Sequence, residues 1–187
     1  MSAIAVYCAS ITRIDPTYLE LASSVGAAIG RRGHTLVTGG GSVAMMGAVG
    51  AAARAAGGHT VGVIPHHLVA MEVADHDSDE LVLVDTMRER KAEMDRRADA
   101  FLVLPGGIGT LEEFFEVWTA ASLGIHAKPV VVLDPDGHYD PLWAWLADLE
   151  KRGFVRRDAL DTLLLTRTVE GALAAVETGR LPEDVSG

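Results

Sequence analysis

Short apolar runs alternate along the whole chain with longer stretches in which apolar residues recur every three or four positions. The short runs are typical of strands and the longer stretches of amphipathic helices. We expect strands at residues 3–10, 34–38, 59–64, 80–84, 100–104, 129–133 and 162–166. Because these runs are almost continuously apolar, helices are expected to cover both faces of their sheet, as in parallel sheets. The pattern predicts an α/β fold: a single Rossmann-like, doubly wound domain over residues 1–187, with about seven mostly parallel strands.

Capping residues and glycines predict where the helices begin and end. Asp15 followed by Pro16 starts the first helix, and Gly33 ends it. Thr86 is expected to cap a highly charged helix, and Gly57 to end an alanine-rich one. Further helices are expected after residue 110, after 140 and over 170–178, and residues 180–187 are expected to form a frayed tail.

Composition and charge narrow the classes of function. The chain of 187 residues has a formal net charge of −10, which argues against nucleic acid as a partner because nonspecific phosphate binding needs a basic surface. The single cysteine, Cys8, cannot form an intramolecular disulfide and lies in an apolar run, where a packing role is expected. The sequence shows no secretory leader and no apolar run long enough to span a membrane, so we expect a cytoplasmic protein without a membrane partner.

Glycines and small polar residues follow three of the expected strands, at residues 8–10, 39–42 and 105–110. In doubly wound sheets, ligands bind outside the carboxyl ends of the strands. For the glycines at 39–42, plain turn geometry is an equally good explanation. A dinucleotide fingerprint is weak there: Gly39, Gly41 and Ala44 fit its loose form, but no acidic residue ends the next strand, and no glycine run is followed by the lysine of an ATP-binding loop.

The stretch "PGGIGTLEE" (105–113) is more specific. Its glycines allow backbone N–H groups to approach an anion, and a helix starting at Thr110 would add its positive end and a hydroxyl donor. This combination predicts a monophosphate site. Glu113 has two interpretations: Thr110 and Glu113 have the spacing of a capping box, or Glu113 takes part in chemistry beside the phosphate.

The charged helix after Thr86 carries two cations, Arg90 and Lys91, at the borders of its apolar stripe. They could be snorkelling side chains or ion-pair partners, or they could bind a phosphate or ribose. The histidines show no metal-ligand spacing, and His126 and His138 are interpreted as turn or surface residues. The poorly patterned segment 65–79 is long enough to be a functional loop.

Two segments together, "MRERKAEM" (87–94) and "PGGIGTLEE" (105–113), resemble the paired motif of the LOG family, the cytokinin riboside 5'-monophosphate phosphoribohydrolases once described as lysine decarboxylases. "GGGSVAMMG" (39–47) and "VYCAS" (6–10) are also similar, and the resemblance spans about residues 4–176. It implies a homodimeric Rossmann-like enzyme that hydrolyses the N-glycosidic bond of an adenine-type nucleoside 5'-monophosphate. The products would be the free base and ribose 5-phosphate, with no cofactor and no metal.

The resemblance also implies roles for individual residues. Arg90 and Glu113 would be the catalytic pair. An anionic Glu113 suits an oxocarbenium-like transition state, and Arg90 would hold the phosphate or ribose. The substrate-contacting positions would be Ser10, Gly41, Glu72, Met87, Lys91, Gly106, Gly107, Gly109, Thr110 and Thr119.

Three places in the sequence depart from the usual family pattern: "CASI" at 8–11 where "CGSS" is usual, "VTGGG" at 37–41 where "VYGGG" is usual, and Ile108, where an aromatic residue is common. They bear on substrate preference rather than on the reaction. Two rival functions remain: a general nucleoside-monophosphate hydrolase that acts on AMP, and a non-catalytic nucleotide or cofactor carrier. Lysine decarboxylation has no support, because no lysine lies in a recognisable pyridoxal-phosphate setting.

Overall fold

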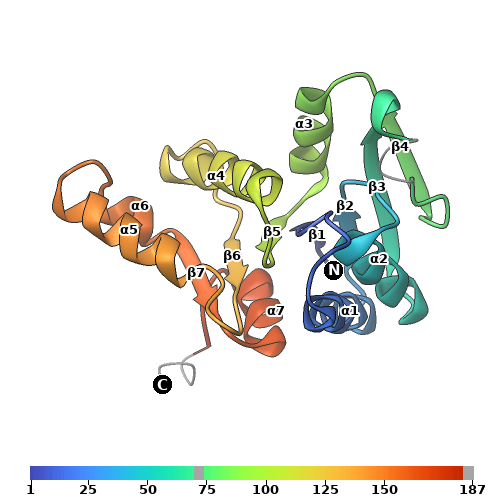
Figure 1. The fold of residues 1–187 in the computed structure, drawn as a ribbon, viewed down its shortest axis with the longest axis horizontal. Coiled ribbons are helices and arrows are strands. Elements are labelled where there is room, and N and C mark those ends of the chain that lie inside the picture. The colour runs from blue at the N-terminus through green and yellow to red at the C-terminus, as the bar shows by residue number, and fades with distance from the viewer. Residues whose placement is uncertain (70–73, 183–187) are drawn as a thin grey trace.

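One seven-stranded sheet organises the molecule, in the order β4-β3-β2-β1-β5-β6-β7 (Figure 1). The structure is a computed structural model that describes residues 1–69 and 74–182. All pairs of neighbouring strands are parallel, so the expected parallel sheet is confirmed. The strands are β1 (Ala3–Tyr7), β2 (Thr35–Thr38), β3 (His59–Pro65), β4 (Glu80–Val84), β5 (Ala100–Val103), β6 (Val130–Leu133) and β7 (Leu163–Thr166).

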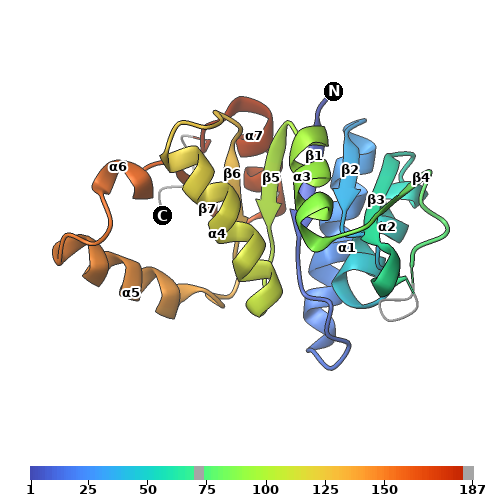
Figure 2. The same cartoon turned by 90° about the horizontal axis from the view of Figure 1, so that it is seen from above.

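Helices cover both faces of this sheet, as the apolar strands predict (Figures 1 and 2). One face packs against α1 (Pro16–Arg31), α2 (Ala44–Ala55) and α7 (Val169–Thr178). The other packs against α3 (Met87–Arg97), α4 (Ile108–Ser122) and α5 (Asp140–Lys151). Two short helices, η1 (His66–Leu68) and α6 (Arg157–Leu160), are not signalled by the sequence pattern.

The alternation of side chains in β1 shows how the two layers are held. Ile4 and Val6 belong to the apolar cluster beneath α1, α2 and α7, whereas Ala5 and Tyr7 belong to the cluster beneath α3 and α4. All four are at most 2% exposed, so β1 is buried on both faces. Its central place explains why this strand has no polar face.

The expected helix boundaries agree with the structure in most places. Asp15 caps α1, its carboxylate accepting from the N–H of Thr17 at 3.0 Å. Thr86 caps α3 in a reciprocal capping box with Glu89. Gly33 follows α1 with a φ of +70°, a conformation that favours glycine. The first strand is shorter than expected, because it ends at Tyr7 and leaves residues 8–10 as a loop.

The strand order locates the ligand-binding edge. Successive strands run outward from β1 through β2 to β4, and outward in the opposite direction from β5 to β7. The direction changes between β1 and β5, and a crevice opens beyond the carboxyl ends of strands at such a point. Among the described residues, no helix has the length and apolar character needed to cross a membrane.

Candidate active site

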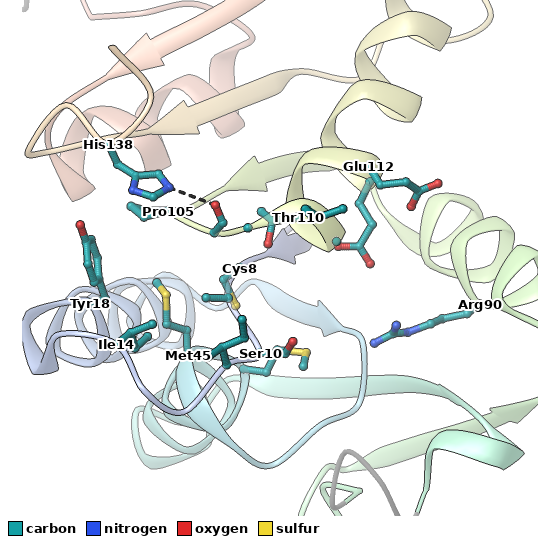
Figure 3. A pocket seen from close by; sticks show the side chains of 18 of the residues that line it. Cys8, Ser10, Ile14, Tyr18, Met45, Arg90, Pro105, Thr110, Glu112 and His138 are labelled. Atoms are coloured by element: carbon teal, nitrogen blue, oxygen red, sulfur yellow. Dashed lines mark hydrogen bonds between the residues drawn. The ribbon is translucent and has the colours of Figure 1, made fainter. Parts of the chain in front are cut away.

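A cavity of about 410 Å³ lies at the carboxyl ends of β1 and β5, where the strand order changes (Figure 3). The loop after β1, the glycine-rich turn after β5 and the start of α3 form its walls. Figure 3 shows Arg90 and Glu112 at one end, with Tyr18, Ile14 and His138 at the other. Eight of the residues implied by the family resemblance line this cavity: Ser10, Met87, Arg90, Gly106, Gly107, Gly109, Thr110 and Glu113.

The glycine-rich turn leads directly into α4, and the helix begins at Ile108 rather than at Thr110. The expectation of a helix start at Thr110 was wrong by two residues, since Gly107 precedes the helix and Thr110 already lies in its first turn. A Cβ added to Gly106 would lie 2.1 Å from Oγ1 of Thr110, and Thr110 itself is 4% exposed. Gly106 therefore lets the turn close onto the Thr110 side chain.

Gly107 and Gly109 differ from Gly106, because a Cβ at either position would meet no atom within 4 Å. Both glycines line the cavity, and they leave open space against the first backbone N–H groups of α4. The amino end of a helix carries unpaired donors and partial positive charge. This is the geometry that a phosphate group requires.

Glu113 does not cap this helix, so the capping-box interpretation was wrong. The residue that precedes the helix is Gly107, which has no side chain to exchange hydrogen bonds with a glutamate. Glu113 lies in the second turn of α4, four residues after Gly109, and therefore faces the same side as that glycine. Glu113 lines the cavity about one helical turn, a rise of ~5.4 Å along the axis, after Gly109.

The negative charge of Glu113 affects the pKa of two buried groups at the end of β1. Burial raises the pKa of the Tyr7 hydroxyl well above its ordinary value; the charge of Glu113 raises it further, and the charge of Arg90 lowers it. Burial also raises the pKa of the Cys8 thiol, with Glu113 adding to the effect. The Cys8 thiol is therefore held neutral, as expected for a packing residue.

Arg90 is 5% exposed and points into the protein, so the snorkelling interpretation was wrong for this residue. Its Nη2 donates to the carbonyl of Gly39 at 2.8 Å, and its Nε donates to the carbonyl of Val63 at 3.1 Å. A Cβ on Gly39 would lie 1.9 Å from Nη2. The glycine after β2 thus makes room for the guanidinium, which is held over the ends of β2 and β3 beside the cavity.

Lys91 and Thr119 lie outside the cavity, in a groove between α3 and α4. The Lys91 ammonium pairs with Glu112 and Glu116, so the ion-pair alternative describes it. Burial alone would lower the pKa of Lys91, but these two carboxylates hold it above its ordinary value. A direct contact of Lys91 or Thr119 with substrate stays a prediction.

The two remaining implied residues have different outcomes. Gly41 is buried and forms an antiparallel bridge with Ala74, which ties the turn after β2 to the segment that follows residue 73; it does not line the cavity. Glu72 lies outside the described residues. Both assignments stay predictions.

Sequence reasoning missed Tyr18 and His138, which line the cavity opposite Arg90. Tyr18 lies on the first turn of α1, and its hydroxyl donates to Asp136 at 2.9 Å. His138 is exposed, as its interpretation as a loop residue required, but its Nε2 lies 3.0 Å from the carbonyl oxygen of Gly106. The only available signal was the position of "DPDGHYD" directly after the sixth strand, at the ligand-binding edge.

The described part of the chain contains no group of three or more His, Cys, Asp or Glu side chains that could hold a metal ion. The cavity offers instead one buried cation, a helix start and carboxylates. These groups suit a ligand with an anionic end next to an electrophilic carbon.

Comparison with known proteins agrees with the resemblance read from the motifs. A family model described as "Possible lysine decarboxylase" matches residues 46–176. A curated relative from Mycobacterium marinum, named cytokinin riboside 5'-monophosphate phosphoribohydrolase, is 56% identical over 94% of both chains. A rice relative named cytokinin riboside 5'-monophosphate phosphoribohydrolase LOG is 43% identical over 93% of this chain and 72% of its own.

A solved structure extends the likeness at the level of the fold. The molybdenum cofactor binding protein of Rippkaea orientalis matches with a TM-score of 0.71 and 21% identity, over 95% of this chain and 96% of that one. Identity this low carries the fold and not the ligand. The near full-length identity to curated relatives goes further, and this chain belongs to the LOG family.

Proposed function

We propose that this protein hydrolyses the N-glycosidic bond of cytokinin riboside 5'-monophosphates and related adenosine 5'-monophosphates, releasing the free base and ribose 5-phosphate. The observation that carries the proposal is the placement of Glu113 one helical turn after Gly109, in the same cavity as the glycine turn at the start of α4. The relatives' names support the same reaction.

The phosphate lies on the glycine turn, where backbone N–H groups and the helix dipole offset its charge. This anchor places the ribose along the first two turns of α4, towards Glu113. Breaking the bond to the base leaves positive charge on the anomeric carbon and ring oxygen. The Glu113 carboxylate stabilises that charge and orients the attacking water, whose hydroxyl adds to the anomeric carbon as the base departs with a proton.

Arg90 has a positioning and electrostatic part in this reaction. Its guanidinium is held rigidly by the carbonyls of Gly39 and Val63, so its charge stays beside the cavity without reorganisation. A fixed cation at that edge orients the anionic substrate. The cavity of about 410 Å³ lies within the range of small-molecule sites.

The first test compares substrates. Cytokinin riboside 5'-monophosphate, AMP and the corresponding phosphate-free nucleosides are incubated with the protein, and free base is followed by chromatography. We expect turnover of the monophosphates and little of the nucleosides, because the glycine turn contributes nothing without a phosphate. The ratio between the two monophosphates separates a cytokinin enzyme from a general AMP hydrolase. Equal turnover of adenosine and AMP would contradict the assignment.

The second test is Glu113→Gln, which keeps the size of the side chain and removes its charge. We expect turnover to fall by roughly two orders of magnitude or more, while AMP still binds and the melting temperature changes by only a few degrees. The control is Glu20→Gln, because Glu20 is an exposed carboxylate on α1 outside the cavity. Unchanged turnover in Glu113→Gln would contradict this mechanism. Binding of AMP without hydrolysis by the wild type would favour the alternative of a non-catalytic nucleotide carrier.

The proposed assembly is a homodimer that forms through the groove between α3 and α4. Leu123 is 64% exposed and Ile125 73% exposed at one end of this groove, and Phe115 also lines it. Exposed apolar side chains that cluster in this way are typical of a protein interface. We expect a dimer in sedimentation at micromolar concentration and a monomer for Ile125→Asp; a fully active wild-type monomer would refute the proposal.

The proposed location is the cytoplasm. Nucleoside monophosphates are charged metabolites that do not cross membranes unaided, so the enzyme must share their compartment. Fractionation of cells followed by detection of the protein tests this directly, and recovery in the membrane or secreted fraction would contradict it.

A further inference from the structure

The loop between β6 and α5 contacts the glycine-rich turn through two adjacent side chains. The Tyr139 hydroxyl donates to the carbonyl of Leu104 at 2.9 Å, and Nε2 of His138 lies 3.0 Å from the carbonyl oxygen of Gly106. The backbone of both residues is held in turn by Asp134, whose two carboxylate oxygens accept hydrogen bonds from the N–H groups of His138 and Tyr139 at 2.8 and 2.9 Å. One carboxylate at the end of β6 thus places both contacts.

The His138 contact fixes the position of a proton. A carbonyl oxygen can only accept, so Nε2 of His138 carries the hydrogen and donates it to Gly106. The ring is also flanked edge-on by Tyr139, with centroids 4.7 Å apart, and by Tyr18, with centroids 6.1 Å apart. His138 therefore presents a donor in a set direction.

The peptide plane between Gly106 and Gly107 can flip unless a hydrogen-bond donor such as His138 holds its carbonyl. Neither flanking residue has a Cβ, so rotation of this peptide plane meets little steric resistance. The described residues contain no cis peptide bond, and in a trans peptide the C=O and N–H point in opposite directions. With the Gly106 carbonyl directed at His138, the Gly107 N–H points away from that ring.

The two orientations of this peptide have opposite consequences for an anion. In the observed one the Gly107 N–H is available as a donor at the amino end of α4. After a flip, the carbonyl oxygen would take its place and repel a phosphate. Tyr139 does not prevent this, because its hydroxyl contacts the Leu104 carbonyl and the Gly106 N–H, which belong to the preceding peptides.

We propose that His138 is a positioning residue that holds the Gly106–Gly107 peptide with its N–H available to the substrate phosphate. The proposal rests on the proposed function, in which a nucleoside 5'-monophosphate occupies this turn. His138 acts through the backbone, and therefore affects substrate binding and not the chemical step.

The test compares His138→Phe and His138→Ala, which remove the donor, with His138→Gln, whose amide nitrogen can reach the place of the imidazole Nε2. His138 is exposed, so all three variants are expected to fold. The matched control is His59→Phe. His59 is an exposed histidine at the start of β3, at the amino ends of the strands and therefore away from the cavity at their carboxyl ends. Two quantities are measured: kcat and KM for the monophosphate substrate, and the Kd of ribose 5-phosphate by calorimetry.

We expect His138→Phe and His138→Ala to raise KM and the Kd of ribose 5-phosphate by about tenfold, with kcat within about twofold of wild type. His138→Gln and His59→Phe should stay near the wild-type values. In NMR spectra at one subsaturating concentration of ribose 5-phosphate, the Gly107 amide signal should shift less in His138→Phe than in the wild type.

Three results would overturn the proposal: an unchanged Kd in His138→Phe, a fall in kcat at constant KM, or a His138→Gln variant as impaired as His138→Phe. The Kd of ribose 5-phosphate tests this inference separately from the proposed function. If the wild type binds ribose 5-phosphate but releases no base, the hydrolase assignment fails, and the dependence of Kd on His138 still decides the positioning role.

Discussion

Gly39→Ala adds one methyl group beside Arg90 while leaving the chemical identity of every catalytic side chain unchanged. The new Cβ would lie 1.9 Å from Nη2 of Arg90 and 2.8 Å from its Cζ. Carbon and nitrogen atoms cannot approach so closely, so the guanidinium must move. Since Arg90 is 5% exposed and packed over the ends of β2 and β3, it cannot move without giving up contacts.

The magnitude follows from the bond that is lost. The smallest displacement breaks the 2.8 Å hydrogen bond from Nη2 to the Gly39 carbonyl. A hydrogen bond from a charged donor contributes about 1.5–3 kcal/mol, and we expect the free energy of unfolding to fall by that amount. For a domain of this size the melting temperature should drop by roughly 3–12 °C. A guanidinium displaced by about 1 Å should also lower turnover by about 100-fold.

A double-mutant cycle isolates the cause. In an Arg90→Ala background the methyl group of Gly39→Ala enters space that the guanidinium has vacated, so the second substitution should cost less than about 0.5 kcal/mol. Denaturant titration of the four proteins measures the coupling, and hydrolysis of the monophosphate substrate measures turnover. If Gly39→Ala destabilises the Arg90→Ala protein as much as the wild type, the glycine serves the turn itself and the reasoning is refuted.

Two further predictions concern stability. Hydrogen bonds from Arg96 and Arg97 hold the pKa of Glu93 at about 2, against an ordinary 4.5, so its stabilisation is fully present above pH 4.5 and is lost as the pH falls towards 2. Denaturant titrations should show Glu93→Gln about 1 kcal/mol less stable than wild type at pH 7, after allowance for solvent screening, with the difference shrinking below pH 4.5; a constant difference would contradict the assignment. Ala44, at the start of α2, has a φ of +52°, which is costly for a residue with a Cβ. Ala44→Gly should therefore raise stability by about 0.5–1 kcal/mol in thermal unfolding, and an unchanged or lower melting temperature would count against this strain.

The position of Glu113 relative to the turn could be read from the sequence alone, but its role could not. Glu113 is four residues after Gly109, and helical periodicity places the two on one face whichever residue starts the helix. The spacing did not decide between a helix start at Ile108 and one at Thr110, and the structure has it at Ile108. A helix that starts at Ile108 has Gly107, not Thr110, at its capping position, and this excludes the capping-box interpretation.

The sequence by itself determined the layers of this protein. Continuous apolar runs alternating with amphipathic stretches predict a parallel sheet covered on both faces, because both patterns arise from neighbouring residues with fixed periods. The same local logic predicted Asp15 and Thr86 as helix caps, since a cap and its N–H partner lie within three residues of each other.

Only the tertiary structure decided which distant groups meet at the cavity. The Arg90 guanidinium reaches a carbonyl 51 residues away at Gly39, and the His138 imidazole reaches one 32 residues away at Gly106. Both contacts depend on the strand order, which sets the ends of β2 and β3 beneath α3 and the end of β6 beside the turn that follows β5. Periodicity along the chain does not specify that order, because every buried strand of a parallel sheet has the same apolar pattern.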